Sequence, residues 1–194
     1  MKRICVFCGS SSGARATYRE AAVQTGRAIA DGGLELVYGG GNIGLMGAVA
    51  DAALEAGGKV IGIIPDGLLR REVGHLNLTE LHIVDSMHER KAMMADLSDG
   101  FIALPGGYGT FEEFFEVVTW AQLGMHRKPC CLLNVEGYYD PMLAMIDRAN
   151  EDKFLRPQHR KLVLVGKSIE DLLEQMNRYT APQSIDKWID RSMT

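Results

Sequence analysis

Glycines and carboxylates are concentrated in the stretch "PGGYGTFEEFFE", which spans residues 105–116 and follows the apolar run "FIAL". Glycines let a backbone approach a ligand closely, and their N–H groups can turn toward an anion where a β-carbon would clash. Thr110 is predicted to be the N-cap of a following helix, so that free N–H groups and the positive helix end face the same point. A plain tight turn is the alternative. A second glycine-rich loop at a neighbouring strand end favours a phosphate-binding site.

Three glutamates, Glu112, Glu113 and Glu116, follow this loop. Thr110 and Glu113 also have the spacing of a capping box, and acidic residues are common at helix starts. Beside a bound phosphate, however, the carboxylates would repel it unless they face another part of the ligand. A ligand with an anionic end and a cationic transition state resolves this conflict. Glu113, Glu116 and the neighbouring Thr119 can then line one pocket wall.

Two cations stand near the start of another predicted helix, in "SMHERK" at residues 86–91. Ser86 and Glu89 have the spacing of a capping box, with Ser86 as N-cap. Arg90 and Lys91 therefore lie near a helix end that repels cations, which favours an anionic ligand over simple solvation. Since this helix follows a strand end, its start is expected to point into the crevice that holds "PGGYGT".

The segment "GGGNIG", residues 39–44, fits the G-x-G-x-x-G pattern of dinucleotide-binding proteins. It adds Gly40 and Gly41 to Gly106 as candidates for the phosphate loop. As evidence for NAD(P)-dependent oxidoreduction the motif is weak, because it follows the second strand and 194 residues leave no room for a substrate domain. That activity stays open only as an alternative.

Seven short apolar runs alternate with segments of helical periodicity, which predicts an α/β protein. The runs are "ICVFCG", "LELVYG", "KVIGIIP", "ELHIVD", "GFIALPG", "PCCLLNV" and "KLVLVG". Helices are expected at residues 16–31, 44–57, 86–98, 110–124, 138–151 and 168–179. Because most runs are apolar throughout, we expect a Rossmann-like, doubly wound parallel sheet of about seven strands with helices on both faces. Ligands bind such sheets outside the carboxyl ends of the strands, where this chain places its glycines.

The composition, with 46% hydrophobic and 24% charged residues, fits one domain, residues 1–180, followed by a C-terminal tail at 181–194. A net charge of −4 gives no basic field, so we expect no nucleic-acid or membrane partner. No apolar run has the length of a secretory signal or a membrane span, which predicts a cytoplasmic protein. The four cysteines lie in or at the end of apolar runs and are expected to be buried, reduced thiols.

The segments "GGGNIGLMG", "SMHERK" and "PGGYGTFEEFFEVVTWAQLG" resemble the Lonely Guy family of cytokinin-activating nucleotide phosphoribohydrolases, and the resemblance extends over residues 1–180. It implies hydrolysis of the N-glycosidic bond of a purine nucleoside 5'-monophosphate, either AMP or an N6-modified, cytokinin-type nucleotide. The products are a free base and ribose 5-phosphate, and neither a cofactor nor a metal is needed. Family members are often labelled lysine decarboxylases, but no lysine here lies in a recognisable pyridoxal phosphate motif.

The same resemblance assigns residues to roles. Arg90 and Glu113 are implied to be catalytic. The positions implied to contact substrate are Glu72, Arg90, Lys91, Gly107, Tyr108, Gly109, Thr110, Phe111, Glu112, Glu113 and Thr119. The family also implies a homodimer with the site near the subunit contact. A non-catalytic nucleotide sensor or carrier of the same fold is the competing function, and the intact Arg90 and Glu113 favour the enzyme.

Elementary chemistry agrees with these roles. Cleavage of a ribosyl bond builds oxocarbenium character on the sugar, which a carboxylate such as Glu113 can stabilise while it orients or deprotonates water. Backbone amides, with Arg90 or Lys91, would hold the phosphate and so position the ribose. No residue identifies the base.

Overall fold

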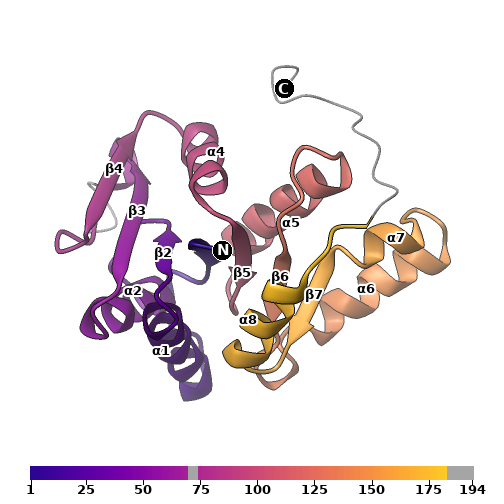
Figure 1. Cartoon of the computed structure of the whole chain (residues 1–194), viewed down its shortest axis with the longest axis horizontal. Helices are drawn as coiled ribbons and strands as arrows, with labels where there is room; N and C mark the ends of the chain where they lie inside the picture. The colour runs from indigo at the N-terminus through magenta and orange to yellow at the C-terminus, as the bar shows by residue number, and fades with distance from the viewer. Residues whose placement is uncertain (70–73, 183–194) are drawn as a thin grey trace.

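The computed structural model describes residues 1–69 and 74–182, and it contains one sheet in which seven strands pair in parallel (Figure 1). The strands are β1 (Arg3–Phe7), β2 (Glu35–Tyr38), β3 (Lys59–Pro65), β4 (Glu80–Val84), β5 (Gly100–Ala103), β6 (Cys130–Leu133) and β7 (Val163–Gly166). Their order is β4-β3-β2-β1-β5-β6-β7. All seven predicted strands are thus confirmed, as is the doubly wound parallel topology.

Helices cover both faces of the sheet, as predicted. They are α1 (Ala16–Asp31), α2 (Gly44–Glu55), α3 (Asp66–Leu69), α4 (Met87–Leu97), α5 (Tyr108–Gln122), α6 (Asp140–Glu151), α7 (Pro157–Arg160) and α8 (Ile169–Arg178), with a 3-10 turn at Val135–Gly137. One apolar core joins the sheet to α1, α2 and α8, and a second joins the opposite face to α4, α5 and α6. Successive strand residues serve the two cores in turn: Ile4 lies in the first and Cys5 in the second.

The edge strand β4 departs from the expectation that every strand is covered on both faces. Only Val84 of this strand is buried, whereas Leu81 and His82 are partly buried and Ile83 is 56% exposed. The physical reason is position, because β4 pairs only with β3 and ends the sheet.

The sheet order creates one crevice at its carboxyl edge. From β1 the chain winds outward through β2 and β3 to β4, and β5 then returns to the other side of β1. The strand order therefore reverses between β1 and β5, where ligands bind in folds of this kind. The loops that follow these two strands are joined by a hydrogen bond from the Gly9 N–H to the Pro105 carbonyl, 3.1 Å long.

Three further observations bear on the sequence predictions. No helix in the described ranges is long and apolar enough to cross a membrane. The four cysteines are buried with free thiols, and burial raises the pKa of each thiol above its usual range. Residues 183–194 of the predicted tail lie outside the described residues.

Candidate active site

A cavity of about 320 Å³ opens at the switch point of the sheet. It is lined by Cys8, Gly9, Ser10, Met46, Leu68, Met87, Arg90, Gly107, Tyr108, Gly109, Thr110 and Glu113. These residues belong to the loop after β1 and to the helices that follow β2, β3, β4 and β5. The predicted convergence of strand ends on one crevice is confirmed. A second cavity of about 250 Å³ shares Gly9, Ser10 and Gly107 with the first and adds Tyr18 and Tyr138 to its lining.

Arg90 reaches this cavity from α4 and is held by the ends of two strands. Its Nε donates to the Ile63 carbonyl at 3.1 Å, and its Nη2 donates to the Gly39 carbonyl at 3.2 Å. The residue is only 8% exposed. The two carbonyls fix the plane of the guanidinium, and its remaining nitrogen, Nη1, lies 3.4 Å from Oε1 of Glu113.

Glu113 projects from α5 into the same cavity and is 9% exposed. Burial raises the pKa of its carboxyl to about 7, since desolvation disfavours the charged form. Arg90 opposes this rise in pKa, whereas Glu112 and Glu116 add to it. A carboxyl with a pKa near 7 can take up and release a proton at neutral pH, as a general base must.

Sequence reasoning missed Gly39, which makes room for this pair. A β-carbon at Gly39 would lie 1.9 Å from Nη2 of Arg90. Only glycine therefore leaves the guanidinium in its observed place. The available signal was that Gly39 is the first glycine of "GGGNIG" and follows β2 directly, but only Gly40 and Gly41 of this motif were predicted to be site residues.

The start of α5 differs from the prediction in its capping residue. The helix begins at Tyr108 with the extended Gly107 as N-cap, so Thr110 lies within the first turn and is buried. The predicted N-cap role of Thr110, and with it the capping box to Glu113, is wrong. The consequence for ligand binding is unchanged, because the first N–H groups of a helix lack intrahelical partners and here they border the cavity.

The start of α4 follows the prediction. The Ser86 hydroxyl accepts a hydrogen bond from the Glu89 N–H at 3.1 Å, while the Glu89 carboxylate accepts from the Asp85 N–H at 3.0 Å. Lys91, one residue beyond Arg90, does not line the cavity. Its Nζ lies 2.5 Å from Oε1 of Glu112 and 3.1 Å from Oε1 of Glu116. In this structure two carboxylates of the chain itself are the anions that Lys91 faces.

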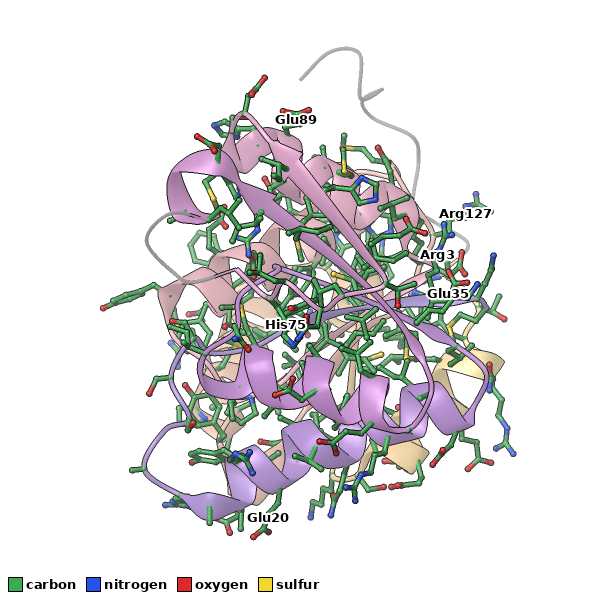
Figure 2. The ribbon with its side chains drawn as sticks, turned by 90° about the vertical axis from the view of Figure 1, so that its left-hand side faces the viewer. Arg3, Glu20, Glu35, His75, Glu89 and Arg127 are labelled. Carbon is green, nitrogen blue, oxygen red and sulfur yellow. The ribbon has the colours of Figure 1, made fainter. Side chains whose placement is uncertain are left out.

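The glycines of the second motif pack against protein. The Gly40 carbonyl accepts from the His75 N–H at 3.1 Å, and Gly41 forms a bridge with Gly74. His75 lies beside α2, where its Nε2 is 2.8 Å from Oδ1 of Asp51 (Figure 2). Among the described residues, the cavity lining includes neither Gly40 nor Gly41.

The last glycine of the motif, Gly44, joins the two loops. It has a φ of 63°, and a β-carbon there would lie 2.3 Å from the Ser10 carbonyl oxygen. The next residue, Leu45, donates its N–H to the Gly9 carbonyl at 3.0 Å. The Leu45 N–H at the start of α2 is thus already bonded to a protein carbonyl and not to a phosphate.

Of the remaining predicted site residues, Thr119 and Phe111 are not part of the cavity lining. Thr119 is exposed, and its hydroxyl donates to the Phe115 carbonyl at 2.7 Å. Phe111 packs edge-on against Tyr139, with ring centroids 6.4 Å apart. Glu72 lies outside the described residues. No group of three or more His, Cys, Asp or Glu side chains within residues 1–69 and 74–182 could hold a metal ion.

The fold and the cavity define an α/β enzyme of the Rossmann-like class with a buried carboxyl–guanidinium pair at its switch point. The family described as "Possible lysine decarboxylase" matches residues 46–176. A probable cytokinin riboside 5'-monophosphate phosphoribohydrolase from Oryza sativa subsp. japonica is 52% identical over 181 residues, which cover 93% of this chain and 74% of that protein. A cytokinin riboside 5'-monophosphate phosphoribohydrolase from Arabidopsis thaliana is 50% identical over 178 residues, which cover 92% and 82%. The chain belongs to the Lonely Guy family of phosphoribohydrolases, which are N-glycosyl hydrolases.

Solved structures with the same fold include a molybdenum cofactor binding protein from Rippkaea orientalis, with a TM-score of 0.69 and 24% identity over 92% of this chain and 97% of that one. A molybdenum cofactor carrier protein from Chlamydomonas reinhardtii has a TM-score of 0.68 and 20% identity, with 92% and 99% covered. Identities this low show a shared fold alone.

The family's description as a possible lysine decarboxylase does not suit this cavity. Pyridoxal phosphate enzymes attach the cofactor to a lysine. No lysine is among the described residues that line the cavity, and Lys91 nearby is paired with Glu112 and Glu116. The described site therefore does not fit pyridoxal phosphate.

Proposed function

We propose that this enzyme hydrolyses the N-glycosidic bond of purine nucleoside 5'-monophosphates, with AMP and N6-modified, cytokinin-type adenine nucleotides as substrates. The observation that carries the proposal is the buried Glu113 carboxyl, held 3.4 Å from Arg90 in a cavity that the start of α5 also lines. The names of the rice and Arabidopsis relatives support the substrate class.

The substrate's phosphate binds at the start of α5 in this proposal. The N–H groups of Tyr108, Gly109 and Thr110 stand at the positive end of a helix of 15 residues and border the cavity. Binding energy from the phosphate positions the ribose, although the phosphate itself does not react.

Glu113 acts on the sugar and on the attacking water. Its carboxylate stabilises the oxocarbenium-like transition state and accepts a proton from water, whose oxygen bonds to C1′. The bond from C1′ to the base breaks, and its electron pair leaves with the base. The proton taken from water is finally carried by the base, so one water yields a free base and ribose 5-phosphate.

Arg90 controls the ionisation and the orientation of the Glu113 carboxyl. Its positive charge limits the rise in the Glu113 pKa that burial causes, so that a useful share of the carboxyl is ionised at neutral pH. Because strand-end carbonyls hold the guanidinium, Arg90 also fixes the direction of the carboxylate.

The test is to incubate the purified protein with AMP and with an N6-prenylated AMP and to assay free base and ribose 5-phosphate. Release of both products supports the proposal, and the ratio of kcat/KM values identifies the preferred base. Tight binding of both nucleotides without release of base would instead support the nucleotide sensor or carrier.

We also propose that the enzyme works as a homodimer in the cytoplasm. Large apolar side chains are exposed on α4 and α5: Tyr108 (92% exposed) and Met87 (40%) line the cavity, and Phe115 (40%) lies further along α5. A second copy would cover them. Four unpaired thiols suit a reducing compartment. Light scattering after size-exclusion chromatography tests the dimer, which a monomeric mass at micromolar concentration would refute.

A further inference from the structure

The turn after β6 is built rigidly and presents two tyrosines to the loop after β5. The Asn134 side chain accepts from the Tyr139 N–H at 2.8 Å and donates to Oδ1 of Asp140 at 2.7 Å. Gly137 has a φ of 74°, which favours glycine at this point of the turn. The turn therefore holds Tyr138 and Tyr139 in one arrangement.

Both tyrosine hydroxyls donate to carbonyls of the loop that leads into α5. Tyr139 donates to the Leu104 carbonyl at 2.6 Å, and Tyr138 donates to the Gly106 carbonyl. The Tyr138 ring is itself fixed by edge-on contacts with Tyr18 and Tyr139, with centroids 5.6 and 5.0 Å away. The loop is thus held from outside by side chains more than thirty residues away in sequence.

These bonds decide where the loop's N–H groups point. In a trans peptide the C=O and the following N–H point in opposite directions, and the described peptides contain no cis bond. The Pro105 carbonyl is turned toward the Gly9 N–H and the Gly106 carbonyl toward Tyr138. The N–H groups of Gly106 and Gly107 are therefore turned away from these partners, and neither makes a hydrogen bond within the described part of the chain.

The two tyrosine bonds differ in this respect. Leu104 precedes Pro105, which has no N–H, so the Tyr139 bond orients no donor. Gly106 precedes Gly107, so the Tyr138 bond orients one. Gly107 is the N-cap of α5, so its oriented N–H lies beside the N–H groups at the start of that helix, which have no intrahelical partner.

We propose that Tyr138 is a positioning residue for substrate recognition: its hydroxyl, by holding the Gly106 carbonyl, aims the Gly107 N–H at the 5'-phosphate. The inference rests on the proposed function, since it assigns a phosphate to this loop. Tyr138 acts through the loop backbone, and the chemical step stays with Glu113.

The test compares Tyr138→Phe with the matched control Tyr139→Phe, which removes the same kind of bond from a peptide without an N–H. Calorimetric titration with ribose 5-phosphate measures phosphate recognition without catalysis. We expect Tyr138→Phe to weaken ribose 5-phosphate binding and to raise the KM for AMP by about tenfold, the size of one hydrogen bond to a charged group, with little change in kcat. Tyr139→Phe is expected to lower Tm while leaving ribose 5-phosphate binding unchanged.

Each outcome decides the inference. Equal weakening by both variants would show general loosening of the loop, and unchanged binding in Tyr138→Phe would show that its hydroxyl is not needed; either result overturns the proposal. A wild-type protein that binds no ribose 5-phosphate also overturns it. If the wild type binds ribose 5-phosphate with the expected dependence on Tyr138 but releases no base from AMP, the positioning role stands and the proposed hydrolysis fails.

Discussion

Nη1 of Arg90 lies 3.4 Å from Oε1 of Glu113, although the two residues belong to helices that follow β4 and β5. Three other strands lie between β4 and β5 in the sheet. Arg90 comes from α4 after the edge strand β4, and Glu113 comes from α5 after β5. The Gly39 and Ile63 carbonyls hold Arg90 over the ends of β2 and β3, which lie between. The pair therefore depends on the order of the whole sheet.

Replacing Glu113 with glutamine is expected to abolish most hydrolysis while nucleotide binding persists. The change keeps the shape of the side chain but removes the charge that stabilises the oxocarbenium ion and accepts the proton. We expect kcat to fall about 10²-fold to 10⁴-fold, the usual contribution of a general base. Glu112→Gln is the comparison, since Glu112 is exposed and pairs with Lys91. Near-normal turnover by Glu113→Gln would refute its assigned role.

The rate should depend on the ionisation of Glu113. Because the carboxylate is the active form and its pKa is about 7, kcat/KM for AMP is expected to rise with pH through a midpoint near 7 and to level off only above it. Arg90→Ala removes a charge that lowers this pKa, so the midpoint of its profile should move to higher pH. A midpoint that stays in place would mean that Arg90 does not control Glu113.

The same ionisation should appear in stability. A pKa raised from 4.5 to about 7 means that the folded state holds this proton more tightly than the unfolded chain does. The resulting stabilisation is complete below pH 4.5 and is lost as pH rises through 7, on the order of 3 kcal/mol in total. Denaturant unfolding at pH 5 and pH 8 should show this loss in the wild type and not in Glu113→Gln. Equal pH dependence in both proteins would contradict it.

A methyl group at residue 39 should displace Arg90 and leave the fold intact. The β-carbon of Gly39→Ala would meet the far end of the Arg90 side chain, which can move, at 1.9 Å. We expect a loss of kcat/KM of at least about tenfold, since a misplaced catalytic group is costly, with a small change in Tm. Gly67→Ala is the control, because a β-carbon there meets nothing within 4 Å. Full activity in Gly39→Ala would show that the position of Arg90 is not critical.

The enzyme should prefer AMP, with one phosphate, over both adenosine and ATP. Adenosine leaves the donors at the start of α5 without an anion, so its kcat/KM should be about 30-fold to 1000-fold below that of AMP, or about 2–4 kcal/mol. ATP brings further negative charge toward Glu112, Glu113 and Glu116 and should be a poor substrate. Cleavage of adenosine within a few-fold of AMP would show that the loop binds no phosphate.

Patterns with a local physical cause could be read from the sequence. Apolar runs gave the strands, and the Ser86 cap of α4 was predicted from its spacing with Glu89. Side-chain contacts between residues that are far apart in the chain could not be predicted in this way. The bonds of Arg90 to strand-end carbonyls, the capture of Lys91 by Glu112 and Glu116, and the bond from Tyr138 to Gly106 all join residues far apart in the chain. The cap of α5 was misplaced because Gly107 has no side chain to signal it.

The four buried cysteines allow opening of the folded protein to be measured by chemical labelling. All four thiols have pKa values raised by burial, and they are distributed over both cores of the sheet, with Cys8 and Cys131 in one and Cys5 and Cys130 in the other. Alkylation requires an ionised, accessible thiol. Cys8 lines the cavity, but Cys5, Cys130 and Cys131 are fully buried, so a reagent can modify these three only when the sheet separates from its helices. The labelling rate of an unmodified sample, resolved cysteine by cysteine by mass spectrometry, would therefore time the opening of each face without any engineered probe.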